Sequence, residues 1–157
     1  MKACSFLPLV VGVALCLTGA NPAKEDQAKK DKDQMQGTWK AVGGEQDGKE
    51  FTEDGLKRGN MKITFKGDRY SFEMTDNQEK LHQEEGKVKL HADKKPKAID
   101  FLIETGKDKG KTQLGIYEIK DGQFNLCVAE AGETERPTEF KTKDGGPTAS
   151  FVMKKQE

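Results

Sequence analysis

The sequence predicts an all-β domain, an antiparallel up-and-down barrel of about eight strands with one short helical turn. From Gly37 to the C-terminus, short segments alternate apolar and polar residues with a period of two, which is typical of strands with one solvated face. Glycine and aspartate pairs such as Asp121-Gly122 separate the segments and favour hairpins. Successive hairpins favour an up-and-down order, and closure into a barrel removes exposed sheet edges. A two-sheet sandwich is the structural alternative, because it satisfies the same alternation.

Residues 1–20 have the features of a signal peptide. Lys2 precedes an apolar stretch, 6–17, that is too short to span a bilayer, and small residues follow it. We expect cleavage after Ala20 or Ala23 and export to the periplasm or the extracellular space. An uncleaved anchor is one alternative. A lipid on Cys16 is another, although the residue before Cys16 is a leucine where a lipidation motif needs a small residue.

Residues 21–34 are charged and polar, without a large apolar side chain. Such a segment buries too little surface to offset its chain entropy, so we expect a disordered tether ahead of a barrel domain at 35–157. A helix over 28–35 is the alternative, but it has no apolar stripe with which to dock.

The domain is expected to begin with a strand at 38–42, around the only tryptophan, Trp39. One short helical turn follows at 52–58, because Thr52 is a suitable N-cap, acidic residues suit the helix start and Gly59 can end it. Each later strand has apolar residues at alternate positions, with Gly, Asp or Pro between strands. These strands are expected at 61–66, 70–75, 87–91, 99–104, 114–119, 124–129 and 149–153.

The alternating apolar residues of these strands are expected to face the barrel interior. They are Trp39, Met61, Ile63, Phe65, Tyr70, Phe72, Met74, Val88, Leu90, Ile99, Phe101, Ile103, Leu114, Ile116, Phe124, Leu126, Val128, Phe151 and Met153. The interior of an eight-stranded barrel is about wide enough either to be filled by side chains or to hold one small ligand. The pattern does not choose between a filled and a hollow interior.

The charge composition argues against nucleic acid as a partner. The chain has 27 basic and 27 acidic residues, so it lacks the net positive charge that neutralises phosphates. Only Arg58, Arg69 and Arg136 offer the bidentate fork that suits phosphate or base edges. We expect no membrane span in the domain, because none of its apolar runs is long enough.

Catalytic and metal-binding motifs are missing from the sequence. Ser71 has no nucleophile elbow around it, and the glycine spacing in 105–112 does not match a phosphate loop. His82 and His91 have no cysteine or histidine at a metal-binding spacing. The acidic pair Glu84-Glu85 near His82 is expected to bind a stray cation only weakly, as most acidic surfaces do. We therefore expect no catalytic residue, metal or cofactor, and a protein that is not an enzyme.

Two acids lie in mid-strand beside apolar neighbours. Asp100 is expected on the outer face, whereas Glu118 has the same parity as Leu114 and Ile116 and is expected to point inward near a barrel mouth.

Cys127 is the only cysteine left once the leader is removed, so it has no partner for an internal disulfide. We expect a small, buried, inert thiol beneath the segment Arg136–Phe140. The competing interpretation is a thiolate that Arg136 activates by lowering the thiol pKa.

Gly37-Thr38-Trp39 is similar to the Gly-x-Trp signature of lipocalins. In that family the tryptophan packs at the closed end of an eight-stranded barrel, and a late basic residue often covers it. The resemblance implies a barrel-end position for Trp39. Arg136 is the only late arginine, but it precedes the final strand.

A second resemblance covers nearly the whole domain and identifies it as similar to a paralogous family of small secreted planctomycete proteins. It implies a lipocalin-like fold, export and no assigned activity, and it implies that Cys127 and Arg136 belong to the family pattern. The segments that carry it are Gln36-Gly37-Thr38-Trp39, Lys95-Pro96-Lys97-Ala98-Ile99-Asp100, Gly115-Ile116-Tyr117-Glu118, Leu126-Cys127 and Arg136-Pro137-Thr138-Glu139-Phe140.

The leading functional expectation is a non-catalytic secreted or periplasmic binding module for a small apolar or amphipathic ligand. The alternative is an envelope interaction or stress protein with a dry core and no small-molecule ligand. A hollow barrel favours the first and a filled barrel the second, while a convergent set of Cys127, His91 and an acid favours an enzyme. The oligomeric state stays open. The residues expected to line a ligand or the barrel end are Trp39, Phe65, Phe72, Phe101, Glu118 and Arg136.

Overall fold

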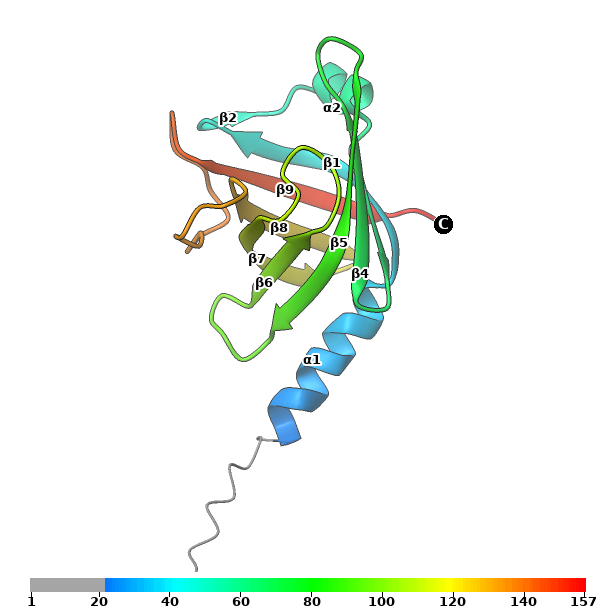
Figure 1. The fold of residues 1–157 in the computed structure, drawn as a ribbon, viewed down its shortest axis with the longest axis vertical. Helices are drawn as coiled ribbons and strands as arrows, with labels where there is room; N and C mark the ends of the chain where they lie inside the picture. Colours follow the sequence, from blue (N-terminus) through cyan, green and yellow to red (C-terminus); the bar gives the residue numbers. More distant parts are fainter. Residues whose placement is uncertain (1–21) are drawn as a thin grey trace, which may run out of the picture.

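The computed structural model describes residues 22–157, so the expected signal peptide lies outside the described residues. Figure 1 shows a barrel with one helix, α1, below it and a shorter helix, α2, at its upper rim. The elements are α1 (Pro22–Met35), β1 (Gly37–Gln46), β2 (Lys49–Glu50), α2 (Glu53–Gly59), β3 (Lys62–Lys66), β4 (Arg69–Thr75), β5 (Leu81–His91), β6 (Ala98–Ile103), β7 (Thr112–Lys120), β8 (Gln123–Ala129) and β9 (Thr148–Lys155).

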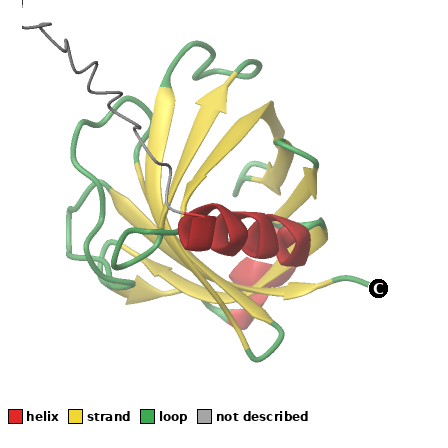
Figure 2. Ribbon diagram, turned by 90° about the horizontal axis from the view of Figure 1, so that it is seen from below, coloured by secondary structure: helices red, strands yellow, loops and turns green. Residues whose placement is uncertain are grey.

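The sheet closes on itself because β1 pairs with both β3 and β9. All pairings are antiparallel, and from β3 to β9 each strand pairs with the next one along the chain. The result is the predicted eight-stranded up-and-down barrel, and the sandwich alternative is wrong. The two-residue strand β2 pairs only with the last two residues of β1. Figure 2 views the barrel from below, with α1 lying across its near end.

Turn residues explain why the strands reverse where they do. Asp121 and Gly122, between β7 and β8, have φ angles of 52° and 73°. Two successive left-handed residues form the tight turn that matches the twist of a hairpin. At α2, Thr52 accepts a hydrogen bond from the Gly55 backbone as predicted, but the left-handed residue that ends the helix is Asn60 rather than Gly59.

Aromatic side chains fill the half of the barrel next to α1. Phe124 of β8 lies at the centre of this layer, with the rings of Trp39, Phe65 and Tyr117 at 5.5, 5.7 and 6.4 Å between centroids. All four side chains are buried in one cluster. This half of the barrel is therefore a packed core.

The predicted facing of β7 is wrong. Tyr117 packs in the interior cluster, whereas Ile116 pairs with Cys127 on the outer face. Leu114 has the same parity as Ile116, so it too faces outward, and Glu118 is exposed outside the barrel. The reason is that the β8–β9 loop covers this part of the wall, so both faces of β7 hold buried apolar residues and alternation does not distinguish them.

The prediction of a disordered tether at 21–34 is wrong for the described part, which is the helix α1. The helix docks without an apolar stripe. Asp31, which is 2% exposed, receives hydrogen bonds of 2.7 Å each from the Tyr117 hydroxyl and from Lys97. Met35 at the helix end is also buried. Asp31 as a polar anchor and Met35 as an apolar contact thus take the place of an apolar stripe along the helix. Neither described helix is long and apolar enough to cross a membrane.

Candidate functional site

The half of the barrel away from α1 is hollow. A cavity of about 520 Å³ lies there, and its apolar walls come from strands on several sides. Wall residues include Phe72, Phe101, Leu126 and Phe151. Binding sites for small molecules are typically about 300–1,000 Å³, so this volume suits one small ligand.

Two aromatic contacts shape the cavity. Its floor is formed by Tyr70 and Phe101, which meet edge to face with centroids 4.8 Å apart. At the rim, Phe51 stacks on Phe151 at 5.7 Å with an interplanar angle of 15°. The floor separates the filled half of the barrel from the hollow half, which settles the point that the alternation left open.

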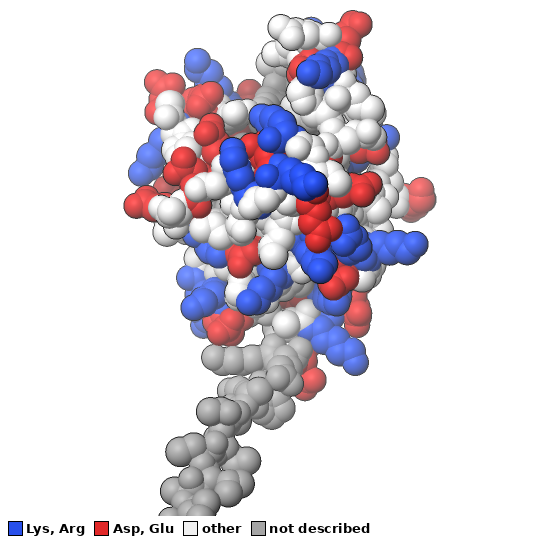
Figure 3. Space-filling model, in the orientation of Figure 1, with Lys and Arg blue, Asp and Glu red and all other residues white. Residues whose placement is uncertain are grey.

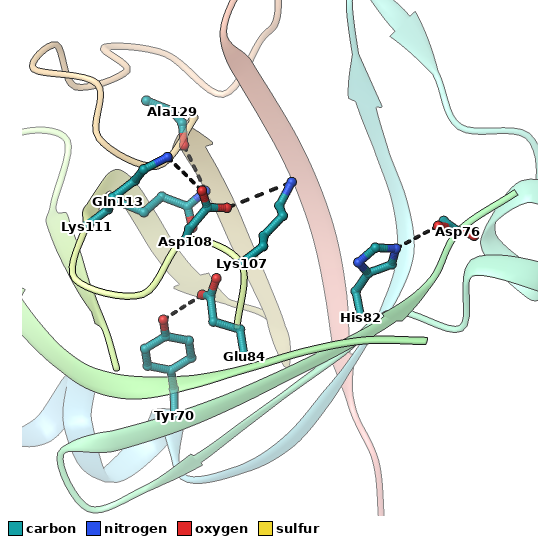
Figure 4. A network of polar contacts seen from close by, with 9 residues as sticks. All are labelled: Tyr70, Asp76, His82, Glu84, Lys107, Asp108, Lys111, Gln113 and Ala129. Atoms are coloured by element: carbon teal, nitrogen blue, oxygen red, sulfur yellow. Dashed lines mark hydrogen bonds and ion pairs between the residues drawn. The ribbon is translucent and has the colours of Figure 1, made fainter. Parts of the chain in front are cut away.

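Polar groups gather on one side of this cavity (Figure 4). Glu84 of β5 faces inward because it pairs with Phe72 across β4 and β5. The Tyr70 hydroxyl donates a 2.7 Å hydrogen bond to the Glu84 carboxylate. Burial raises the pKa of Glu84, and the hydrogen bond from Tyr70 only partly counteracts it.

Gly86 makes the contact between Tyr70 and Glu84 possible. It pairs with Tyr70 across the two strands, and an added Cβ would lie 3.0 Å from the Tyr70 ring and 2.0 Å from the Leu102 carbonyl oxygen. A side chain at this position would therefore displace the ring or the neighbouring strand. Glycine allows Tyr70 to lie across β5 and reach the carboxylate two residues away.

The β6–β7 loop supplies charged groups at the cavity mouth. Asp108 is an acceptor for Lys111 at 2.8 Å, and the Lys107 amine lies 3.8 Å from the same carboxylate. Nearby, the Gln113 side-chain amide donates a 2.8 Å hydrogen bond to the Ala129 carbonyl. Asp108 is thus the ion-pair partner of both lysines, and Gln113 is uncharged.

A separate histidine–aspartate pair lies at the end of β5. His82 is 2.6 Å from Asp76, and this hydrogen bond is the main reason that the pKa of Asp76 falls to about 2. Figure 4 shows the pair away from Glu84 and the loop, and neither residue lines the cavity.

The predicted site residues divide into three groups. Phe72 and Phe101 line the cavity, and Phe65 lies in the filled half. Trp39 is 2% exposed at the α1 end, where its indole nitrogen donates a 2.7 Å hydrogen bond to the Met35 carbonyl. Glu118 lies on the outer face, so its inward prediction is wrong.

The basic residue that covers Trp39 is Lys155, not Arg136. Lys155 pairs with Trp39 across β1 and β9, and its amine lies 5.5 Å from the centre of the indole ring. Gly37, with a φ of 102°, leaves the space that this side chain crosses, because an added Cβ would be 3.0 Å from Lys155 Cε. The covering residue therefore comes from the final strand.

Arg136 lies outside the barrel, so the prediction that it lines a ligand or the barrel end is wrong. It donates hydrogen bonds to the carbonyl oxygens of Ile99 and Gly115 and to Asp100. Asp100, on the outer face as predicted, is also 2.7 Å from His91. Burial favours a higher pKa for Asp100, but the hydrogen bonds from His91 and Arg136 outweigh it and lower the pKa. Arg136 thus fastens the β8–β9 loop to the barrel wall.

Cys127 is fully buried on the outer face of β8, which confirms the packed position predicted for it. Ser150 pairs with Cys127 across β8 and β9, and its hydroxyl donates a 3.0 Å hydrogen bond to the Phe140 carbonyl. The β8–β9 loop therefore lies over these two outward-facing residues. Burial raises the pKa of Cys127 to about 11. His91 lies three strands away from Cys127 along the line of paired residues that crosses β5 to β8, so the two side chains do not converge.

Among residues 22–157, no three histidine, cysteine or acidic residues form a metal-binding group.

Sequence reasoning missed Glu84 and Asp31. Glu84 has the same parity as Val88 and Leu90, and extending the strand back by a few residues would have placed it inside the barrel. Asp31 carries no local signal, because its partners Lys97 and Tyr117 are distant in sequence.

No protein-family model, curated protein or solved structure matches this chain. The structure itself shows an eight-stranded antiparallel barrel with Trp39 buried at one end.

Proposed function

We propose that the protein is an exported, non-catalytic binding module that holds one small amphipathic ligand in the hollow half of the barrel. The observation that carries the proposal is the cavity of about 520 Å³, with apolar walls and polar groups on one side. Apolar walls with a few convergent polar groups are typical of small-molecule sites. The envelope-protein alternative with a dry core is less well supported, because the interior is only half filled.

Two further features agree with this proposal. Lys, Arg, Asp and Glu side chains are interspersed over the face that Figure 3 shows, without a broad basic surface for nucleic acid. The leader and the resemblance to a secreted family support export.

A fluorescent probe tests the proposal. N-phenyl-1-naphthylamine is neutral and apolar, and we expect its emission to rise on binding to the purified protein. Ala149→Trp should fill the cavity, which Ala149 lines, and abolish the signal. Val152→Trp is the matched control, because Val152 is on the other face of β9 and pairs with Asn125.

The proposal fails if folded wild-type protein gives no signal with the probe, or if the two tryptophan variants bind it equally well. Circular dichroism establishes that each variant is folded. Native mass spectrometry of protein purified from its own host then looks for the natural ligand as a mass adduct that denaturation removes.

A further inference from the structure

Glu84 is an acidic side chain on the interior face of the barrel, beside apolar wall residues. On β5 it shares the interior face with Gly86, Val88 and Leu90, and it lines the cavity beside Phe72. A carboxylate in such a place is costly unless it is paired. Its hydrogen-bond partner in the described chain is the neutral Tyr70 hydroxyl, which satisfies one oxygen without neutralising the charge. The charge of Lys107 favours the carboxylate, but together with Tyr70 it does not outweigh burial, so the pKa of Glu84 stays raised.

The nearby lysines have another partner. Lys111 and Lys107 both face Asp108, whose side chain is 19% exposed, whereas the two lysine side chains are 51% and 83% exposed. An anionic headgroup would have to displace Asp108 from these lysines and would bring a second negative charge close to Glu84. The electrostatics of the mouth therefore disfavour a carboxylate ligand.

A second acceptor lies on the same side of the cavity. Gln113 uses its side-chain nitrogen to hold the Ala129 carbonyl, so its amide oxygen is the group left to face a ligand. A carboxylate and an amide oxygen complement a headgroup that carries several N–H donors.

We infer that the cavity selects amphiphiles with a protonated amine headgroup, held by Glu84, over the corresponding alcohols and carboxylates. The inference rests on the proposed function, since it concerns the headgroup of a ligand in the same cavity. An ammonium group would supply the charge that Glu84 lacks, while the alkyl chain would lie against the apolar walls. The raised pKa of Glu84 agrees with a buried carboxylate whose neighbouring groups do not fully offset the cost of burying its charge.

Competition among three ligands of equal chain length tests the inference. Octylamine, octanol and octanoate are titrated at pH 7 against protein loaded with N-phenyl-1-naphthylamine. We expect octylammonium to displace the probe at about tenfold lower concentration than octanol, because hydrogen bonds to charged groups are stronger than neutral ones. Octanoate should be the weakest competitor.

Glu84→Gln should bring the amine and the alcohol to about equal potency. Glu85→Gln is the matched control and should keep the preference, because Glu85 is exposed on the outer face of β5. Preference for octanoate, or an amine preference that survives Glu84→Gln, overturns the inference. If the probe binds and all three ligands compete equally, the binding function stands and only the amine selectivity falls. If the probe does not bind to the folded protein, the proposed binding function is wrong, and the amine selectivity that rests on it is wrong as well.

A second measurement uses the unmodified protein and so does not depend on folding of the variant. The ¹³C shift of the Glu84 carboxyl reports its titration, with Tyr70 of β4 and Lys107 and Asp108 of the β6–β7 loop as the groups that face it. Saturating octylammonium should lower this pKa, and octanol should not. An unchanged pKa in the presence of bound octylammonium overturns the inference.

Discussion

Tyr117 of β7 donates its hydroxyl hydrogen to Asp31 of α1 at 2.7 Å, which ties the core of the barrel to a helix outside it. Both side chains are at most 2% exposed, and Lys97 completes the anchor with a hydrogen bond of 2.7 Å to the same carboxylate oxygen. Asp31 is therefore the polar anchor of α1, beside the apolar contact of Met35, and the consequences of removing it are measurable.

Asp31→Asn should destabilise the protein by about 1–3 kcal/mol, because it removes the charge that Lys97 and Tyr117 face in a buried site. Urea unfolding followed by tryptophan fluorescence measures the change, since Trp39 bonds the last residue of α1. Asp33→Asn, an exposed change on the same helix, is the control and should have almost no effect. Equal stabilities of the two variants would contradict the anchoring role.

The same carboxylate makes stability depend on pH. Burial favours a higher pKa for Asp31, but hydrogen bonds from Lys97, Tyr117 and Gln27 outweigh it and lower the pKa below 3.8. Because the folded-state pKa is lower than the unfolded one, the stabilisation is complete above about pH 5 and is lost as pH falls through the folded-state value. We expect the stability difference between wild type and Asp31→Asn to shrink between pH 5 and pH 2. A constant difference would show that Asp31 does not titrate in this way.

Trp39→Ala should cost about 3–5 kcal/mol, because it removes a large buried ring from the filled half of the barrel. Val42→Ala, on the same strand but 45% exposed, should change stability by less than about 0.5 kcal/mol. Chemical denaturation followed by far-ultraviolet circular dichroism measures both. A loss below about 1 kcal/mol for Trp39→Ala would reject the core role of Trp39.

Cys127 should react slowly with a thiol reagent at neutral pH and quickly once the protein is unfolded, because it is fully buried. Arg136→Ala should speed up the reaction, since this arginine fastens the covering loop to Ile99, Gly115 and Asp100. A thiolate activated by Arg136 predicts the opposite, a slower reaction in the variant. The direction of the change therefore separates a packed thiol from an activated one.

The barrel was predictable from the sequence because most of its strands have one face in water. Alternation identified the inward residues of β3, where Ile63 and Phe65 are buried, and of β6, where Ile99 and Phe101 are buried. It failed on β7, where a loop from another part of the chain buries Ile116 on the outer side. When both faces of a strand are buried, an alternation with a period of two does not show which face points into the barrel.

The candidate site was less predictable for a different reason. The aromatic walls Phe72 and Phe101 follow from alternation, but the volume between them depends on how side chains from several strands pack. Glu84 and Lys97 act through contacts with residues on other elements, so their roles become visible only when the strands are assembled.

The pairing of β1 with β9 has a consequence for how other proteins can recognise this one. In a closed sheet each long strand has a neighbour on both sides over at least part of its length, so the described barrel offers little free backbone edge onto which a partner could add a strand. The exceptions are β2, which pairs with β1 alone, and residues 81–85 of β5, which pair with β4 but not with β6. Over the rest of the barrel a protein partner must recognise side chains, on the barrel wall, on the rim loops or on α1. The same closure protects the domain against edge-to-edge aggregation.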